Sequence, residues 1–391
     1  MGSGKAQSSA PSASATAPTT ASLEIEWAEQ PFEGTVSSVV ADGAQFVAVG
    51  TVDGSAASWT SSDGVTWRRD PVSDPIFDED VVGPTGIPMD LARGPGGGQL
   101  VRLGDTLYSF GTSNFMDHNW PVGWRRTDGA AWEYIVSQSQ FFSFGVVVDV
   151  TASTNALLAA TMGGNPEVPS GLDYTHSAST WLWTAETSWV RSGLAATPDD
   201  RIHITATTWS DGTYVAVGVR AEPTEGQTPS SWPTAPSIWT SADGRTWTNI
   251  TLPEGLGALC TVRALPGGGF IGIEIADDEF TAWTSETGAA WTGSGPLPAR
   301  LLPSDEPGPF VRGCEVVPLE RGLLATLRSE DGVLTWTSTD GRTWEVGETL
   351  DLSVYGPPVV AALGNDVVVF GTRRDASGAG PPVLLHGTPQ P

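Results

Sequence analysis

Apolar residues occur along the chain in short runs that come in pairs, and the two runs of a pair are separated by a turn. The first pair is Val36–Val40 and Phe46–Val49, separated by Ala-Asp-Gly-Ala at 41–44. Runs of this length, rich in β-branched residues and bounded by turn signals, predict antiparallel strands. Further pairs are Ile202–Thr207 with Tyr214–Val217, Cys260–Leu265 with Phe270–Ile273, and Cys314–Leu319 with Leu323–Leu327.

Tryptophans mark a second repeated unit, which lies after each pair of runs. Residues 59–67 read WTSSDGVTW, and close copies occupy 239–247 and 336–344, in each of which the second Trp follows the first by eight positions. Asp can accept backbone N–H bonds within a turn and Gly can adopt a positive φ, so each copy predicts a β-hairpin. Looser or shorter copies occupy 124–132, 183–189 and 283–291.

A pair of runs followed by a Trp hairpin gives four short strands per unit, named a to d in chain order. Six complete units occupy residues 36 to about 347. The C-terminal part between 359 and 387 supplies three more strands, and residues 23–27 supply one. Four-stranded units repeated around an axis are the blades of a β-propeller. The sequence therefore predicts one all-β domain over 22–391, a seven-bladed propeller whose last blade is closed by the N-terminal strand.

Residues 1–21 differ from the rest, since they are mostly Ser, Ala, Thr and Pro without an apolar period. Such a segment cannot bury a core, so we expect a disordered tether. A tether of this kind commonly follows the lipid-modified cysteine of an exported lipoprotein. We therefore expect an extracellular or cell-envelope protein whose native precursor could carry a lipid anchor; an ordinary disordered tail or an expression remnant is the alternative.

Composition and charge narrow the possible partners. The chain of 391 residues has 45 acidic and 19 basic side chains, a net charge of −26. This charge repels phosphate backbones, so we expect no nucleic-acid partner. No apolar stretch reaches the roughly 18 residues of a transmembrane helix. The 17 Trp argue against disorder along the whole chain. We expect a monomer.

The two cysteines lie at matching positions in adjacent units. Cys260 begins CTVRAL and Cys314 begins CEVVPL. Inner strands of neighbouring blades converge near the axis of a propeller, so a disulfide between them is geometrically plausible. Such a bond agrees with an exported protein. Two buried thiols are the alternative.

The motif Ser-x-Asp-Gly-x-Thr-Trp resembles the Asp-box, or bacterial neuraminidase repeat. Its four Asp-Gly copies lack the residue that the family usually has between Asp and Gly, and the copy at Glu286-Thr287-Gly288 has that residue but no Asp. The resemblance implies a propeller in which the box forms the c–d turn, away from the active face. It therefore implies a structural role for Asp63, Asp128, Asp243 and Asp340. The family includes sialidases, other glycosidases and non-catalytic binding proteins, so the fold alone does not decide the activity.

A sialidase-like glycoside hydrolase is the alternative function that this resemblance raises. Sialidases of the family carry an Arg-Ile-Pro motif, which this chain lacks, and three arginines that clamp the substrate carboxylate. Arg201, Arg263 and Arg312 lie at or near the starts of strands a in successive units, so they could converge around the axis and recognise a carboxylate. They could equally be ordinary blade residues paired with nearby acids. We assign no catalytic residue and expect a non-catalytic protein.

Long connections favour a ligand site on one face of the propeller. Strands b and c are separated by Ser113–Gly123, Gly164–Ser179 and Ala221–Pro236 in the second, third and fourth units. Exposed aromatic residues in such loops suit stacking against a sugar or a peptide, although they could also pin their own loops. We therefore expect a protein that binds a glycan or an extracellular protein. The candidate residues in these connections are His118, Trp120, Tyr174, His176 and Trp232.

No cofactor is expected. The four histidines show no tight metal-ligand spacing, and no phosphate-binding glycine loop stands out. The acid-rich stretch from Asp70 to Asp80 leaves calcium open as an alternative, but a charged solvated loop explains it equally well.

Overall fold

The computed structural model describes residues 23–53, 55–70, 99–115, 118–127, 130, 132–135, 146–162, 178–185, 187–194, 201–221, 234–276, 279–299, 313–354, 358–373 and 380–390. These residues form thirty β-strands and no helix. It follows that none of the described segments is a helix that could cross a membrane. Residues 1–22, the predicted tether, lie outside the described part of the chain.

The strands form seven antiparallel sheets, each containing four strands in the order a, b, c, d. Blades 1 and 2 contain β2 (Thr35–Asp42), β3 (Gln45–Val52), β4 (Ser55–Ser61), β5 (Arg68–Arg69), β6 (Gln99–Leu103), β7 (Thr106–Phe115), β8 (His118–Thr127) and β9 (Glu133–Ile135). Blades 3 and 4 contain β10 (Val146–Ala152), β11 (Ala156–Met162), β12 (Ala178–Thr184), β13 (Thr187–Ser192), β14 (Arg201–Ser210), β15 (Thr213–Ala221), β16 (Thr234–Ser241) and β17 (Thr248–Asn249).

The remaining three blades follow the same order. Blades 5 and 6 contain β18 (Leu259–Ala264), β19 (Phe270–Ala276), β20 (Glu279–Ser285), β21 (Thr292–Gly293), β23 (Cys314–Leu319), β24 (Gly322–Ser329), β25 (Gly332–Ser338) and β26 (Glu345–Val346). Blade 7 contains β28 (Val359–Leu363), β29 (Asp366–Arg373), β30 (Pro382–Pro389) and β1 (Ile25–Gln30). The short strands β22 (Leu297–Pro298) and β27 (Leu352–Ser353) pair with β20 and β29.

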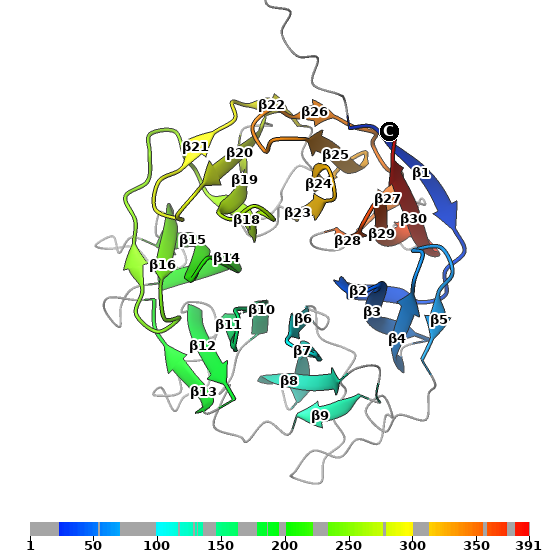
Figure 1. Ribbon diagram of the computed structural model, residues 1–391, viewed down its shortest axis with the longest axis horizontal. Helices are drawn as coiled ribbons and strands as arrows, with labels where there is room; N and C mark the ends of the chain where they lie inside the picture. The colour runs from blue at the N-terminus through cyan, green and yellow to red at the C-terminus, as the bar shows by residue number, and fades with distance from the viewer. Residues whose placement is uncertain are drawn as a thin grey trace, which may run out of the picture.

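The seven sheets surround a central axis, with strand a of each blade innermost (Figure 1). The predicted seven-bladed propeller is therefore confirmed. Strands c end at the c–d turns and strands a end at the a–b turns, and both kinds of turn lie on one side of the ring, which we call the turn face. The b–c and d–a connections lie on the other side, the connection face.

Blade 7 is completed by the N-terminal strand, as the sequence predicts. β1 pairs antiparallel with β30, with Ile25 opposite Pro389 and Trp27 opposite Gly387. Leu23 is buried against residues of blades 6 and 7, including Leu319. Because both ends of the described chain meet in this blade, the ring is closed by pairing rather than left with an open strand edge.

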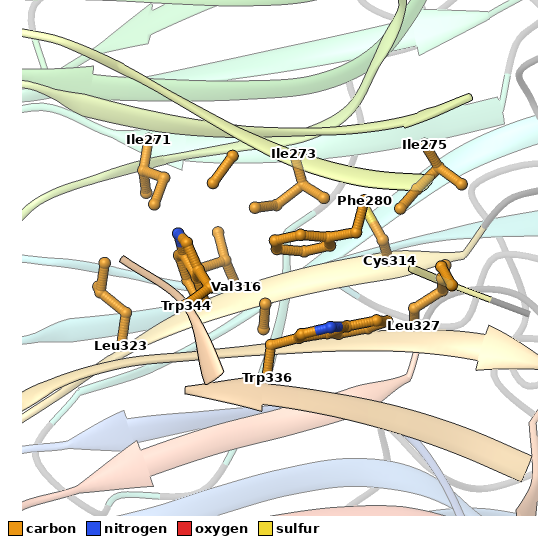
Figure 2. Close-up of a cluster of buried hydrophobic side chains, with 13 residues drawn as sticks. Ile271, Ile273, Ile275, Phe280, Cys314, Val316, Leu323, Leu327, Trp336 and Trp344 are labelled. Atoms are coloured by element: carbon orange, nitrogen blue, oxygen red, sulfur yellow. The ribbon is translucent and has the colours of Figure 1, made fainter. Parts of the chain in front are cut away.

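The core lies between the blades, where side chains of adjacent sheets interdigitate. Figure 2 shows the cluster between blades 5 and 6, where Phe280 of β20 stacks on Trp336 of β25 with ring centroids 4.6 Å apart. Trp344 meets the edge of Phe280 at 5.4 Å. The hairpin Trp of one blade thus packs on the preceding blade, which explains why Trp recurs in every copy of the motif.

Two glycines occupy places where no side chain fits. Gly244 has a φ of +68°, and a Cβ there would lie 2.9 Å from Leu182 of blade 3. The c–d turn of blade 4 therefore packs directly on its neighbour. On β15, a Cβ at Gly218 would lie 1.8 Å from the carbonyl oxygen of His203, because strand a bulges toward β15 between Ile204 and Ala206.

Candidate functional site

Side-chain hydrogen bonds join the inner strands of neighbouring blades around part of the channel. The Ser38 hydroxyl accepts a bond from the Leu100 backbone N–H at 3.1 Å, which links β2 to β6. The Thr205 hydroxyl donates to the Leu259 carbonyl at 2.8 Å, which links β14 to β18. Strand a has no neighbouring strand on its channel side, so these bonds satisfy polar groups that the sheet leaves open.

Three charged side chains of inner strands meet near the axis of the ring, and we call them the channel cluster: Asp149 of β10, Arg263 of β18 and Glu315 of β23. Nη2 of Arg263 donates to Oε2 of Glu315 at 2.6 Å, and Nη1 lies 3.5 Å from Oδ2 of Asp149. Nη1 also donates to the Val262 carbonyl at 2.9 Å. The guanidinium therefore connects blade 5 both to its neighbour blade 6 and to blade 3, two blades away.

Backbone groups hold the two carboxylates of the channel cluster in place. Asp149 accepts bonds from the N–H groups of Val150 at 2.9 Å and Thr207 at 2.7 Å. Glu315 accepts a bond from the N–H of Val316 at 2.9 Å. Backbone groups as well as Arg263 therefore hold both carboxylates in place. Because the carboxylates are held in this way, they orient the guanidinium between them.

Burial has the largest effect on the pKa values of the two carboxyl groups in the channel cluster. Removal from water raises the pKa of Asp149 and of Glu315, although Arg263 and the backbone N–H bonds oppose this shift. Burial also acts to lower the pKa of Arg263, but Glu315 and Asp149 outweigh it and the pKa is raised. The cluster therefore combines a permanently charged guanidinium with two carboxyl groups whose charged forms are costly to keep in the channel.

The structure describes only part of the predicted ligand site. His118 and Trp120 lie on β8 and Arg201 begins β14, but the placement of these three side chains lies outside the description. Tyr174, His176, Trp232 and Arg312 lie outside the described residues altogether. The described strands nevertheless fix where their connections start and end, which is on the connection face.

The predicted loop at Ser113–Gly123 is wrong in its secondary structure. β7 and β8 continue through this segment as a paired hairpin, with Ser113 opposite Trp120 and Phe115 opposite His118. In blade 1 the corresponding strands pair only as far as Val52 and Ser55. The Asn residues at 114 and 119 and the Pro at 121 made the segment resemble a loop.

The three arginines considered for a carboxylate clamp do not lie at one level. Arg201 is the first residue of β14, on the connection face, whereas Arg263 lies near the opposite end of β18. Each residue of a strand advances about 3.3 Å, so the two backbones are separated by several residues along the axis. The guanidinium of Arg263 also contacts two carboxylates of this chain, those of Asp149 and Glu315.

Cys260 and Cys314 form a disulfide, as the sequence predicts. Their Cα atoms are 6.1 Å apart on β18 and β23, within the usual range for this bond. The bond joins the same two strands as the contact between Arg263 and Glu315. Blades 5 and 6 are therefore cross-linked both covalently and electrostatically beside the channel.

The Asp-Gly turns show the hydrogen bonds expected of a structural element. Oδ1 of Asp63 accepts bonds from the N–H groups of Val65 and Thr66 at 2.9 and 2.7 Å. These two bonds lower the pKa of Asp63 to about 2, and the bond from Thr66 contributes most. In the same way, bonds from the N–H groups of Thr246 and Arg245 lower the pKa of Asp243 to about 2. Asp340 accepts the corresponding bonds, and they lower its pKa although burial opposes them. Asp128 lies outside the described residues.

Blade 2 departs from the motif in a way that sequence reasoning missed. Arg126 replaces the Ser that stands two positions before the Asp in blades 1, 4 and 6, and its side chain is only 5% exposed. Nη1 donates to Oδ2 of Asp70 in blade 1 at 2.8 Å, and the guanidinium lies over the Trp132 ring at 5.4 Å. An arginine at a position that is otherwise a buried Ser signals such a pair, because a buried charge requires a partner.

Asp149 and Glu315 were also missed, although each interrupts an apolar strand. Asp149 follows three valines, and Glu315 stands between Cys314 and Val316. Within the described ranges, no group of three His, Cys, Asp or Glu side chains is arranged to hold a metal ion. Of the acidic stretch weighed for calcium, only Asp70 is described, and it contacts Ser58 and Arg126.

Comparisons with known proteins agree with the propeller architecture. No protein-family model matches the chain, and no curated protein matches its sequence. Solved structures do match: virginiamycin B lyase from Staphylococcus aureus has a TM-score of 0.56 at 10% identity, over 93% of this chain and 99% of its own. A structure described as YCF48 bound to D1 peptide has a TM-score of 0.53 at 14% identity, over 95% and 98%.

A sialidase is among the matching structures. The Trypanosoma rangeli sialidase has a TM-score of 0.50 at 13% identity over 87% of this chain, which spans 59% of the sialidase. All three identities are low, so the likenesses establish the fold and leave the ligand to be argued from this chain's own residues.

Proposed function

We propose that this protein is a non-catalytic binding propeller whose ligand, a glycan or an extracellular protein, docks on the connection face. The observation that carries the proposal is the contrast between the two faces of the ring. On the turn face, the described Asp-Gly turns are short, hydrogen-bonded and packed on neighbouring blades. On the connection face, the chain is much longer between several strands, at residues 71–98, 163–177, 222–233 and 299–313.

A rigid ring with variable connections on one side is a common arrangement for recognition. The strands fix the ends of each connection, so side chains there can be presented in a constant geometry. Trp120, Tyr174 and Trp232 belong to this face by their place in the chain, and aromatic rings suit stacking on a sugar or contact with a peptide. The YCF48 structure, which contains a bound peptide, supports a protein ligand as one of the two classes.

Binding by the connection face is tested with two tryptophan variants. Trp120→Ala and Trp232→Ala should each weaken binding to a captured ligand by about tenfold or more, because central aromatic anchors dominate binding energy. Val346→Ser is the control, since Val346 is exposed on the outer edge of blade 6. Candidate ligands come from a pull-down with native cell envelopes and from a glycan array. Unchanged binding in both Trp variants would contradict the choice of face.

A sialidase-like glycoside hydrolase is the alternative function, and an activity assay distinguishes it from a binding protein. If the wild-type protein hydrolysed a fluorogenic sialoside and Arg201→Ala or Arg312→Ala abolished this turnover, the protein would be a glycosidase and not a non-catalytic binding protein. The proposal expects no turnover above the uncatalysed rate.

We also propose that the protein is exported from the cytoplasm. The support for export is the disulfide between Cys260 and Cys314, because such bonds persist in oxidising compartments. Protein isolated from its native cells under alkylating conditions should contain no modified cysteine before reduction. Two alkylated cysteines in that sample would contradict export.

A further inference from the structure

Glu274 is a buried carboxylate at a position where the repeated blade structure does not require a side chain. It lies on β19 of blade 5, opposite Leu259 of β18, and is 7% exposed. The corresponding residues of blades 1 and 4 are Gly50 and Gly218, each of which likewise lies opposite the residue before the bulge in strand a. A charged residue at a position that is glycine in other blades indicates a role particular to blade 5.

Glu274 binds the connection that leads from blade 4 to blade 5, residues 250–258. Its Oε1 accepts a bond from the backbone N–H of Gly257 at 2.9 Å, and Oε2 accepts one from Nε1–H of Trp283 at 2.6 Å. A Cβ at Gly257 would lie only 2.3 Å from Oε1, so the carboxylate lies directly against the backbone of the connection. Trp283 belongs to β20 of the same blade. The carboxylate therefore holds the connection against the body of blade 5.

This arrangement keeps a negative charge buried without a cation. Among the described residues, the side-chain bonds of Glu274 are those to the two N–H groups, and neither donor is charged. Burial raises the pKa of Glu274, although the bonds from Trp283 and Gly257 act to lower it. A neutral side chain would avoid the cost of burying a charge. The carboxylate supplies two acceptor oxygens instead, and its charge-assisted bonds are stronger than bonds between neutral groups.

The connection presents an ordered turn on the connection face. The N–H of Leu256 donates to the carbonyl of Pro253 at 3.3 Å, and Gly255 has a φ of +84°, the positive value that a type II turn requires there. Leu256 is buried in a core cluster formed by blades 4 and 5, whereas Glu254 and Gly255 are exposed. The turn is thus anchored by Leu256 and Gly257, and its tip is open to the solvent.

We propose that Glu274 is a positioning residue of the ligand site, which fixes the connection 250–258 so that its tip at 253–255 contacts the ligand. This inference rests on the proposed binding function and assigns to it a described part of the connection face. A segment that is already held in one conformation loses little freedom when a ligand binds, so a fixed turn favours affinity. Glu274 acts through the backbone of Gly257, because its own side chain is buried.

Hydrogen exchange of the full chain tests the positioning without a ligand. Glu274→Ala removes both acceptor oxygens, so amide exchange across 250–258 should become about tenfold faster, the effect of losing a hydrogen bond to a charged group. Glu274→Gln keeps one carbonyl acceptor and should have a smaller effect. Glu320→Ala is the matched control, since Glu320 is exposed in the a–b turn of blade 6, on the turn face. Unchanged exchange in Glu274→Ala overturns the proposal.

Binding measurements show whether the fixed turn belongs to the ligand site. The probes are a glycan array and solubilised native cell envelopes. Glu274→Ala should bind the probe that the wild type recognises about tenfold more weakly, and Glu320→Ala should bind it as the wild type does. Gly257→Ala should weaken binding similarly, because its Cβ would push the connection away from the carboxylate. The double variant should bind no more weakly than either single one, since both changes break the same contact.

Circular dichroism and thermal melting check that each variant is folded, and Gly257→Ala decides if Glu274→Ala does not fold. If exchange becomes faster but the variants bind as tightly as the wild type, the connection is not part of the ligand site and the proposal is wrong. The proposed function stands in that case, with binding through Trp120 or Trp232. If the wild type binds neither probe, the proposed function fails, and the role of Glu274 in binding fails with it.

Discussion

At the scale of single residues, Arg125 and Arg126 are neighbours on β8 with opposite surroundings. Arg125 pairs with Glu133 in water, where the side chains are 54% and 66% exposed. Arg126 is buried and pairs with Asp70 of blade 1. The energy of an ion pair depends on this difference, because an exposed pair contributes little and a buried charge that loses its partner is costly.

This pair of arginines gives a stability prediction with an internal control. Asp70→Asn should lower the free energy of unfolding by roughly 3 kcal/mol, because it leaves the buried Arg126 guanidinium without a carboxylate. Glu133→Gln should change it by less than about 1 kcal/mol. Urea denaturation of the two variants measures both values. Equal effects would show that burial of Arg126 is not what gives the pair its energy.

The aspartates of the c–d turns predict a pH dependence. The pKa of Asp63 and Asp243 is about 2 in the folded protein, below the ordinary value of 3.8. A depressed pKa contributes stability above about pH 4, and this contribution is lost as the pH falls toward 2. Asp243→Asn should therefore be less stable than the wild type at neutral pH, and the difference should shrink from pH 4 to pH 2. Denaturation midpoints measured across that range test it; a constant difference would contradict the assignment.

At the scale of elements, β1 determines whether the ring closes. It covers the outer edge of β30 over six residue pairs, and without it that edge would be open to other chains. Removal of residues 1–30 should yield protein that aggregates or unfolds non-cooperatively, whereas removal of residues 1–21 should leave the melting temperature unchanged. Size-exclusion chromatography and calorimetry compare the two truncations. A stable monomer lacking β1 would contradict the role of this strand.

The strands themselves were largely predictable from the sequence, because the information is local and repeated. Trp59, Trp239 and Trp336 identify the same strand in three blades, and Asp-Gly at a constant spacing identifies the turn that follows. The hairpin at 113–120 was not predictable, since its Asn and Phe residues show no clear apolar alternation and Pro121 follows directly. The pairing there continues the register that β7 and β8 share from Thr106 and Thr127 onward.

The candidate site was harder to predict from the sequence than the strands were. Asp149, Arg263 and Glu315 come from three blades and are brought together only by closure of the ring. Composition and spacing could identify each as a charge in an inner strand, but not which charges meet. The disulfide was easier to predict, because Cys260 and Cys314 occupy equivalent positions in adjacent units.

At the scale of the whole molecule, the disulfide restricts the unfolded chain across blades 5 and 6. It closes a loop of 54 residues, for which the chain-entropy model gives about 4 kcal/mol. The double variant Cys260→Ala and Cys314→Ala should therefore have a free energy of unfolding lower by about this amount, measured by urea denaturation, and still form the propeller. Unchanged stability would mean that the reduced unfolded chain is already restrained.

The closure of blade 7 also decides how the molecule can be attached to a support. β30 ends and β1 begins beside the c–d turns, so Leu23 and Gln390 both lie at the turn face. A tag or surface linkage at either end of the described chain projects from that side, and the connection face stays free. A linkage at this end of the described chain should therefore leave the connection face directed toward the solution when the protein is immobilised on a sensor chip.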